Sequence, residues 1–351
     1  MDINTLIEIA RRQRASDIHI TAARNPVFRI DGTLIETDFA LNMEEKKNLL
    51  YSMMNQAQTE KFDSGRDVDM AYSTPSGDRQ RVNIYRQQEF MTAAIRIINT
   101  KTPTFDELKL PETLRQLTAQ PRGLVLITGP TGSGKSTTLA AMIDHINKTR
   151  ACHILTIEDP VEYVYTQDKS FIHQRDVGVD IDSFSSALRS AMREDPDVIL
   201  VGEMRDYETV SAAITAAETG HLVLSTLHTT GAAATIDRII DVFPPHNQQQ
   251  IRTQLASTLK GVITQTLLPR AAGAGRVAAF EIMLGSDAIL NLIREVKGHQ
   301  INSTIQMSAK QGMVLLDTYL ANLVRSGTVS MEAAKERAND VSEFMSAVTR
   351  V

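Results

Sequence analysis

Residues 129–137 read Gly-Pro-Thr-Gly-Ser-Gly-Lys-Ser-Thr, which matches the phosphate-binding pattern G-x4-G-K-[ST] in full. An apolar run at 124–127 precedes this stretch, and a segment with helical spacing, 137–146, follows it. A strand, a glycine-rich turn and a helix in this order form a P-loop, whose backbone N–H groups surround a phosphate at the start of the helix. The sequence therefore predicts a nucleotide-binding site.

Different residues of the P-loop are expected to contact different parts of the nucleotide and its metal ion. We expect Lys135 to reach the β- and γ-phosphates of ATP, and Ser136 to offer its hydroxyl to Mg²⁺. Thr137, one residue further along, is expected to contact the α-phosphate. The residues predicted to bind the nucleotide are Gly129, Thr131, Gly132, Ser133, Gly134, Lys135, Ser136 and Thr137.

Carboxylates follow two of the next apolar strands, expected at 153–157 and 198–201. In α/β folds, the carboxyl ends of the strands form the ligand crevice. Glu158 and Glu162 are therefore candidates for activating water, although a solvated acidic loop is the alternative. Glu203 ends the second strand, and because Gly202 occupies the place of the usual Walker B aspartate, Glu203 is predicted to hold Mg²⁺ through water.

Two histidines flank the apolar strand expected at 222–225. His228 follows this strand on the phosphate side, where it could sense the γ-phosphate by hydrogen bonding. His221 precedes the strand at the opposite end, and the residues alone suggest no role for it. A structural role is the alternative for either histidine.

The chain has 351 residues, enough for two to three domains at roughly 150 residues each. Strand-like runs and one helical stretch, 43–62, predict a small α+β domain over residues 1–99. A proline-containing linker follows at 100–111, and then strands and helices alternate over 112–285, which predicts a parallel sheet wrapped by helices. Apolar residues at 289, 292, 293 and 296 open a helical lobe over 286–351.

Composition limits the classes of partner and the compartment. With 42 acidic and 37 basic residues the net charge is −5, which argues against nucleic acid as a partner. The single cysteine, Cys152, can form neither an intramolecular disulfide nor a zinc cluster, so we expect a reducing compartment such as the cytoplasm. Residues 1–14 do not resemble a secretion signal, and no apolar run is long enough to cross a membrane.

Four motifs together resemble the signatures of the secretion-superfamily ATPases, and most closely those of the type IV pilus retraction ATPases. These motifs are GPTGSGKST at 129, TIEDPVEY at 156, LRSAMREDPDVILVGEMRD at 188 and GHLVLSTLHT at 220. They are similar to the Walker A motif, the Asp box, an atypical Walker B motif and the His box. The similarity extends over nearly the whole chain.

The resemblance implies a homohexameric, Mg-ATP-dependent motor with a PAS-like N-terminal domain and a RecA-like core. By the same resemblance Glu162 is the general base, Glu203 the Walker B glutamate, and His228 with His221 the His-box pair. Arg81 and Arg96 match the arginines of the N-terminal domain that neutralise the γ-phosphate. A guanidinium fork suits this purpose, because it can stabilise the charge of the transition state.

The resemblance also implies that the motor powers pilus retraction, and hence twitching motility, from the inner face of the cytoplasmic membrane. Its implied partners are an inner-membrane platform protein, the pilus base and a second retraction ATPase. Leu290 stands where the family has arginine in its C-terminal motif, so the direction of work stays open. The alternatives are an accessory retraction subunit, an assembly or secretion ATPase, and a weakly hydrolysing nucleotide-binding module.

Overall fold

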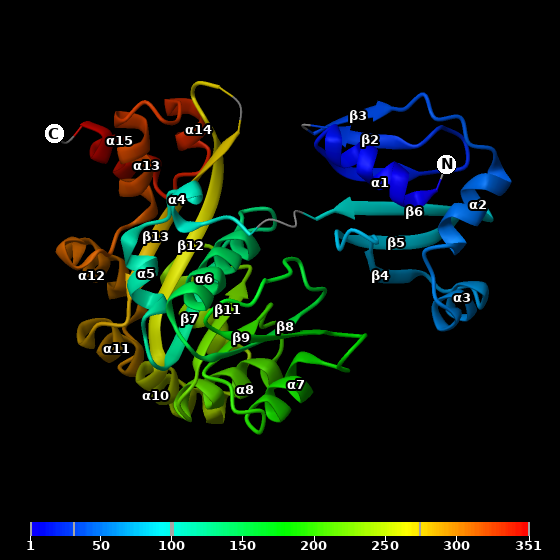
Figure 1. The fold of residues 1–351 in the computed structure, drawn as a ribbon. Coiled ribbons are helices and arrows are strands. Elements are labelled where there is room, and N and C mark those ends of the chain that lie inside the picture. The colour runs from blue at the N-terminus through cyan, green and yellow to red at the C-terminus, as the bar shows by residue number, and fades with distance from the viewer. Residues whose placement is uncertain (1, 31, 99–101, 274, 350–351) are drawn as a thin grey trace. The chain divides into compact units, whose positions relative to one another are not determined.

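The computed structural model describes residues 2–30, 32–98, 102–273 and 275–349. The chain folds into two compact units. The first unit comprises residues 1–101 together with Pro160–Val164, and the second comprises Thr102–Asp159 and Tyr165–Val351 (Figure 1).

The first unit contains a six-stranded antiparallel sheet in the order β3-β2-β1-β6-β5-β4. Its strands are β1 (Ala15–Ile20), β2 (Val27–Ile30), β3 (Thr33–Glu36), β4 (Val68–Ser73), β5 (Arg79–Gln87) and β6 (Phe90–Ile97). Its helices are α1 (Ile3–Arg12), α2 (Met43–Tyr51) and α3 (Gln56–Asp63). Side chains of α1, α2 and one face of the sheet form a hydrophobic core of their own, as expected for a small α+β domain.

Two local features of this unit differ from expectation. The helical stretch 43–62 is interrupted, because Asn55 adopts an extended conformation and forms a capping box with Gln58 that starts a second helix. The edge strands β3 and β4 were not predicted; in β3 all four residues are exposed and no buried position alternates along it. The sheet therefore has more strands than the apolar pattern indicates.

The second unit contains a seven-stranded sheet in the order β13-β12-β7-β11-β10-β8-β9. Its strands are β7 (Gly123–Thr128), β8 (His153–Glu158), β9 (Phe171–Asp176), β10 (Val198–Val201), β11 (Leu222–Leu227), β12 (Leu259–Pro269) and β13 (Arg276–Leu284). β7 to β12 are all parallel to one another, and β13 is antiparallel to β12. The α/β class is as predicted, but the sheet is mixed and also contains β9, β12 and β13.

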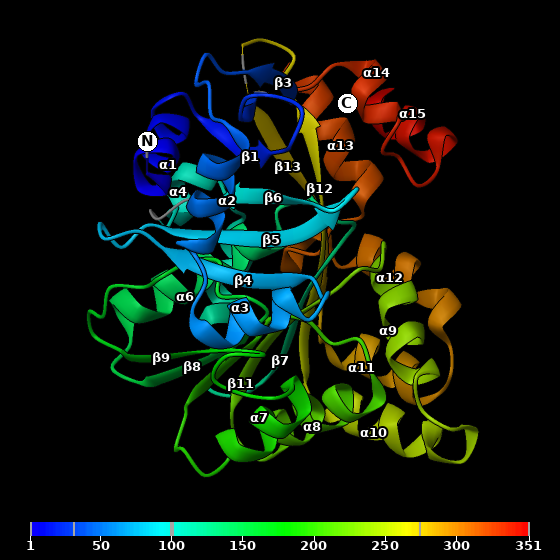
Figure 2. The same ribbon diagram turned by 90° about the vertical axis from the view of Figure 1, so that its right-hand side faces the viewer.

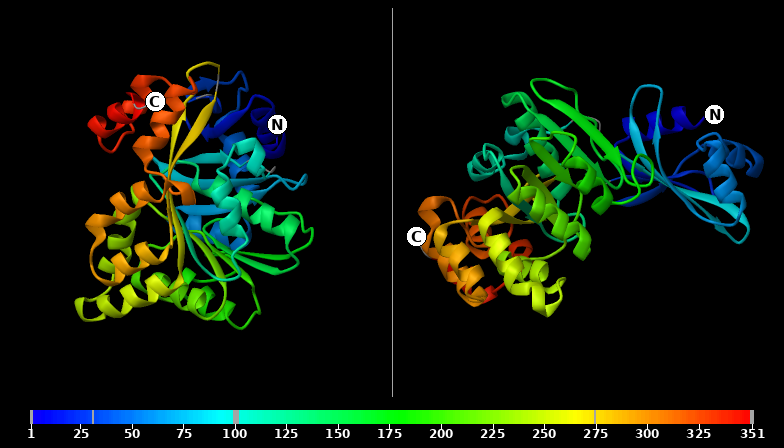
Figure 3. Two further views of the ribbon diagram at one scale, coloured as in Figure 1. Left: turned by 90° about the vertical axis from the view of Figure 1, so that its left-hand side faces the viewer. Right: turned by 90° about the horizontal axis from the view of Figure 1, so that it is seen from below.

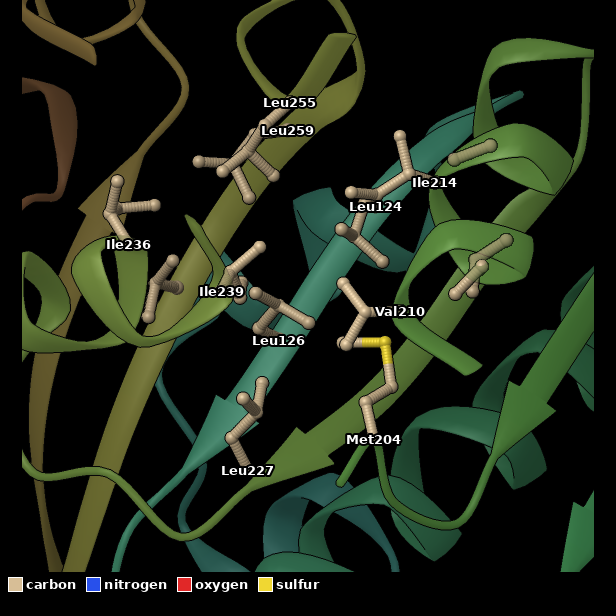
Figure 4. Close-up of a cluster of buried hydrophobic side chains, with 14 of the residues drawn as sticks. Leu124, Leu126, Met204, Val210, Ile214, Leu227, Ile236, Ile239, Leu255 and Leu259 are labelled. Atoms are coloured by element: carbon tan, nitrogen blue, oxygen red, sulfur yellow. The ribbon is translucent and has the colours of Figure 1, made fainter. Parts of the chain in front are cut away.

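The helices α5 to α10 accompany this sheet. A one-turn helix, α4 (Phe105–Leu108), comes before them. The six helices are α5 (Glu112–Thr118), α6 (Lys135–Thr149), α7 (Phe184–Ala191), α8 (Tyr207–Glu218), α9 (Ala232–Asp241) and α10 (Gln248–Thr258). Side chains of α8, α9 and α10 pack on β7, where Leu124 and Leu126 lie at the centre of a buried cluster (Figure 4). Burial of this apolar surface fixes the strand that leads into the P-loop.

The predicted linker contains a short helix in its latter part. Residues 99–101 lie outside the described residues, and 102–111 includes α4, whose Phe105 is buried against His145 of α6 with ring centroids 5.0 Å apart. The latter part of the linker therefore packs on the second unit.

The C-terminal segment is helical, as expected, and it belongs to the second unit. Its helices are α11 (Asp287–Arg294), α12 (Ile301–Met307), α13 (Leu316–Arg325), α14 (Met331–Lys335) and α15 (Val341–Thr349). α11 and α12 pack with α9 and α10 (Figure 2). α13 to α15 share a core with the β12–β13 hairpin (Figure 3). The helix expected to reach Val296 ends at Arg294, because Val296 has a left-handed φ of 61°.

Glu281 of β13 joins two of these helices to the sheet. Its Oε1 accepts a hydrogen bond from the backbone N–H of Ala232 at 2.7 Å, and its Oε2 accepts one from Leu316 at 3.4 Å. These N–H groups begin α9 and α13, so one buried carboxylate caps two helix N-termini. Burial raises the pKa of Glu281, while the two backbone hydrogen bonds oppose that rise.

None of the helices in the described ranges is both long and apolar enough to cross a membrane.

Candidate nucleotide-binding site

The predicted P-loop connects β7 to α6. Gly129 has a φ of 137°, and a Cβ built on it would lie 2.2 Å from the backbone oxygen of Gln265. Gly134, with a φ of 91°, would bring a Cβ within 2.7 Å of Gln265 Nε2. Glycine is therefore required at both positions, by backbone conformation and by the closeness of β12.

Lys135 lies inside the loop that it follows. Its side chain is buried, and its Nζ donates hydrogen bonds to the carbonyl oxygens of Gly129 at 2.8 Å and Pro130 at 3.0 Å. The ammonium group is thus held beside the backbone that a P-loop wraps around phosphate. Phosphate oxygens can replace the two carbonyl acceptors with little movement of the side chain.

The remaining loop hydroxyls differ in exposure. Ser136 is exposed in the first turn of α6, and Thr137 beside it is half-buried. Ser133 is buried, and within the described part of the chain its hydroxyl has no hydrogen-bond partner. Such an unsatisfied donor inside an anion-binding loop is costly unless a ligand or water completes it.

Glu203, His228 and Thr131 form a hydrogen-bonded row. His228 Nε2 lies 3.2 Å from Glu203 Oε2, and His228 Nδ1 lies 3.4 Å from the Thr131 hydroxyl. Because a carboxylate only accepts, Nε2 carries the proton, and in the neutral ring Nδ1 accepts from Thr131. The structure thus brings together the loop, Glu203 and His228.

Sheet order explains this convergence. β11 lies between β7 and β10, and all three strands are parallel, so their carboxyl ends meet at one edge.

Glu203 has a second partner besides His228. Its Oε1 pairs with Arg205 at 2.5 Å. The Glu203 side chain is 15% exposed, and both of its oxygens are engaged.

Glu158 ends β8 at the same edge, but on the far side of β10 from the loop. Its carboxylate is buried and accepts a hydrogen bond from the Thr156 hydroxyl at 2.7 Å. Within the second unit, the nearer carboxylate is therefore Glu203.

His221 lies at the opposite edge of the sheet, just before β11. Its Nδ1 lies 2.8 Å from the carbonyl oxygen of Ala216 in α8. β11 separates His221 from His228 along its length, as expected from the sequence, and the His-box roles implied for the two histidines stay predictions.

The other three predicted site residues belong to the first unit. Arg81 on β5 pairs with Asp69 at 2.9 Å, and Arg96 on β6 pairs with Asp17 at 3.1 Å. Both guanidinium groups reach the exposed face of the antiparallel sheet. Glu162 is exposed within the segment Pro160–Val164.

The donors near the loop fit Mg²⁺ in type. The Ser136 hydroxyl and the Glu203 carboxylate are hard oxygen ligands, which Mg²⁺ prefers, and substrate phosphates and water usually supply the rest. No group of three or more His, Cys, Asp or Glu side chains suitable for a metal occurs among the described residues. The donor set suits an ion that arrives with the nucleotide.

Sequence reasoning missed three polar residues of this site, Gln265, Thr138 and Arg205. Gln265 was missed because β12 was not predicted. A signal existed, since Val262, Ile263 and Thr264 are β-branched and a glycine-containing turn follows the strand at 270–275.

Parallel central strands, a glycine loop at the start of a helix and a carboxylate that follows the second strand from the loop strand together define a P-loop nucleotide-binding protein. The sequence matches the type II/IV secretion system protein family over residues 1–342. The chain belongs to this family of secretion ATPases.

Two relatives and one solved structure show where in the family the similarity is high. The type IV pilus retraction ATPase PilT of Pseudomonas aeruginosa is 48% identical, over 98% of this chain and 100% of its own. A twitching motility protein of Neisseria gonorrhoeae is 46% identical, over 98% of this chain and 92% of its own. A crystal structure of the pilus retraction motor PilT with bound ADP superposes with a TM-score of 0.92 at 45% identity, covering 98% of both chains.

Proposed function

We propose that this protein is an ATP-hydrolysing motor that retracts type IV pili. The observation that carries the proposal is the row from Thr131 through His228 to Glu203 beside Lys135, because it joins a phosphate loop to a carboxylate. Near-full-length similarity to a pilus retraction ATPase supports the biological role.

In this proposal the second unit binds Mg-ATP. The loop amides and Lys135 would hold the β- and γ-phosphates. Ser136 would hold the ion directly, and Glu203 would hold it through water. The bound Mg²⁺ supplies charge neutralisation at the phosphates. His228 donates Nε2–H to Glu203 and so fixes the direction of that carboxylate, while its Nδ1 faces the loop through Thr131.

The first unit supplies the remaining chemistry in the proposal. Glu162, an exposed residue, is the general base that removes a proton from the attacking water. Arg81 and Arg96 stabilise negative charge on the γ-phosphate as it is transferred. The side-by-side placement of two guanidinium groups on one sheet face supports this role.

We further propose a homohexamer on the cytoplasmic side of the inner membrane. Its proposed partners are the platform protein, the pilus base and a second retraction ATPase. We propose that each subunit consists of a PAS-like domain, a linker, a RecA-like core and a C-terminal lobe. Leu290 of α11 packs against the hydrophobic core in place of the arginine of related motors. Retraction is therefore tested separately from hydrolysis.

The biochemical test is steady-state phosphate release from Mg-ATP by the wild type, Lys135→Ala and Glu203→Gln. We expect turnover by the wild type only, and a wild-type rate no higher than that of both variants would refute the motor. Direction is tested in cells, where deletion of the gene should leave excess, non-retracting pili. Bald cells would instead indicate an assembly motor.

A further inference from the structure

β12 extends beyond the strand that it pairs with. β7 ends at Thr128, which is the register partner of Thr264, whereas β12 continues to Pro269. Gln265 is therefore the first residue of β12 past the end of β7, and it lies beside the P-loop. The expected clash of a Cβ on Gly129 with the Gln265 backbone shows how close this approach is.

The Gln265 side chain is buried, with 2% of its surface exposed, and both ends of its amide are hydrogen-bonded. Nε2 donates to the carbonyl oxygen of Ser133 at 2.8 Å. Oε1 accepts from the hydroxyl of Thr138 in α6 at 2.7 Å. The orientation of the amide is unambiguous, because a carbonyl oxygen can only accept and therefore must face the NH₂ group.

One of these bonds controls a backbone donor of the loop. In a trans peptide the C=O of one residue and the N–H of the next point in opposite directions. The bond that turns the Ser133 carbonyl toward Gln265 therefore turns the Gly134 N–H away from β12. The second bond attaches the same side chain to α6, whose N-terminus follows Gly134.

We propose that Gln265 is a positioning residue that holds the P-loop in its nucleotide-binding shape. It acts through Ser133 and Thr138 and sets the direction of the Gly134 N–H, without touching the nucleotide itself. The inference rests on the nucleotide binding of the proposed function and adds a residue to the machinery of that site.

The test is the affinity of the full-length protein for Mg-ADP, measured by calorimetry. Gln265→Met keeps the length of the side chain but removes both hydrogen bonds, and we expect about tenfold weaker binding, equivalent to about 1.4 kcal/mol. Thr264→Val is the matched control. It removes a buried hydrogen bond to Thr128, 2.9 Å long, from the neighbouring position of β12 without touching the loop.

A second variant separates positioning from general destabilisation. Gln265→Glu places a carboxylate oxygen against the Ser133 carbonyl at neutral pH, but a protonated carboxyl could again donate to it. Burial raises the pKa of an introduced carboxyl. We therefore expect the Mg-ADP affinity of this variant to recover toward that of the wild type as the pH falls from 8 to about 5.5.

The outcomes are distinct. Weak binding by both Gln265 variants, with recovery of Gln265→Glu at low pH and wild-type affinity in Thr264→Val, supports the inference. Equal affinities for wild type and both Gln265 variants would overturn the positioning role of Gln265 but not the proposed function. A wild type that does not bind Mg-ADP would overturn both. If Gln265→Met does not fold, the pH response of Gln265→Glu decides the question, and a flat response counts against positioning.

Discussion

Arg81 of β5 lies directly opposite Arg96 of β6 in the antiparallel register. Like charges opposite each other normally destabilise a sheet. Here carboxylates flank the pair, since Asp69 pairs with Arg81 and Asp17 with Arg96. The face thus presents two adjacent guanidinium groups, each of which is held by a carboxylate of a neighbouring strand.

We predict that Arg81→Ala and Arg96→Ala each lower kcat for ATP hydrolysis by at least about tenfold, because an arginine that stabilises the transition state contributes that much or more. Folding should change little, since exposed ion pairs contribute about 0–1 kcal/mol. Phosphate release and urea unfolding measure the two effects. Arg29→Ala is the control, because Arg29 is a neighbour of Asp17 on the same sheet but is not among the predicted site residues. Unchanged turnover in both variants would remove these arginines from the mechanism.

Glu203→Gln should abolish most turnover and leave nucleotide binding intact. The amide loses the negative charge that faces His228 and Arg205 and binds Mg²⁺ less well, so we expect a loss of about 100-fold or more in kcat, as for the loss of one electrostatic stabiliser of the transition state. Glu194→Gln is a matched control in the same unit, because Glu194 pairs with Arg175 at 2.9 Å and is not among the predicted site residues. Comparable losses in both variants would point to a general effect of removing a carboxylate.

Gly129→Ala should destabilise the fold more than Gly178→Ala. Both glycines have positive φ, 137° and 83°, so both variants carry backbone strain of about 1–2 kcal/mol. Only Gly129 would place a Cβ 2.2 Å from a backbone oxygen, whereas nothing lies within 4 Å of a Cβ on Gly178. Urea denaturation measures the difference, and equal losses would contradict the close approach of β12.

Glu281 should make stability depend on pH in a defined direction. Burial raises its pKa above the ordinary value of 4.5, so the folded chain binds this proton more tightly than the unfolded chain does. The contribution of Glu281 to the free energy of unfolding is therefore fully present below pH 4.5 and declines as the pH rises toward the folded pKa. Asp317 adds to the upward shift, and the N–H groups of Ala232 and Leu316 oppose it.

This dependence is measured as the difference in unfolding free energy between wild type and Glu281→Gln across the pH range above 4.5. We expect the difference to decline with rising pH. A constant difference would mean that Glu281 has the same pKa in both states. The charge-preserving comparison is Glu281→Asp, which should keep the sign of the slope while losing one of the two helix caps.

The P-loop strand and the three strands after it in the α/β alternation were predictable, because each is a short apolar run bounded by turns. The hairpin of β12 and β13 was not. α10 ends at Thr258 and β12 begins at Leu259 without an intervening glycine or proline. Polar side chains within these buried strands, such as Gln265 and Glu281, also interrupt the apolar run that would have indicated them.

The residues of the candidate site also divide into those that the sequence predicted and those that it did not. Lys135, Glu203 and His228 follow directly from motif and strand order, and the structure brings the latter two into hydrogen-bonding distance. Arg205 and Gln265 depend on where side chains point after folding, which spacing does not reveal. The roles of Glu162, Arg81 and Arg96 stay predictions.

Gln265 and Glu281 lie on adjacent rungs of the β12–β13 hairpin, since Thr264 is opposite Glu281 and Gln265 is opposite Phe280. A shift of this hairpin by one residue would turn every side chain of the moved strand to the other face. Deleting a single residue from β12 ahead of Gln265 would thus remove the support of the P-loop and bring a different residue opposite Glu281. The connection between β12 and β13 can change in length at far lower cost, so insertions there are the changes that this hairpin should tolerate.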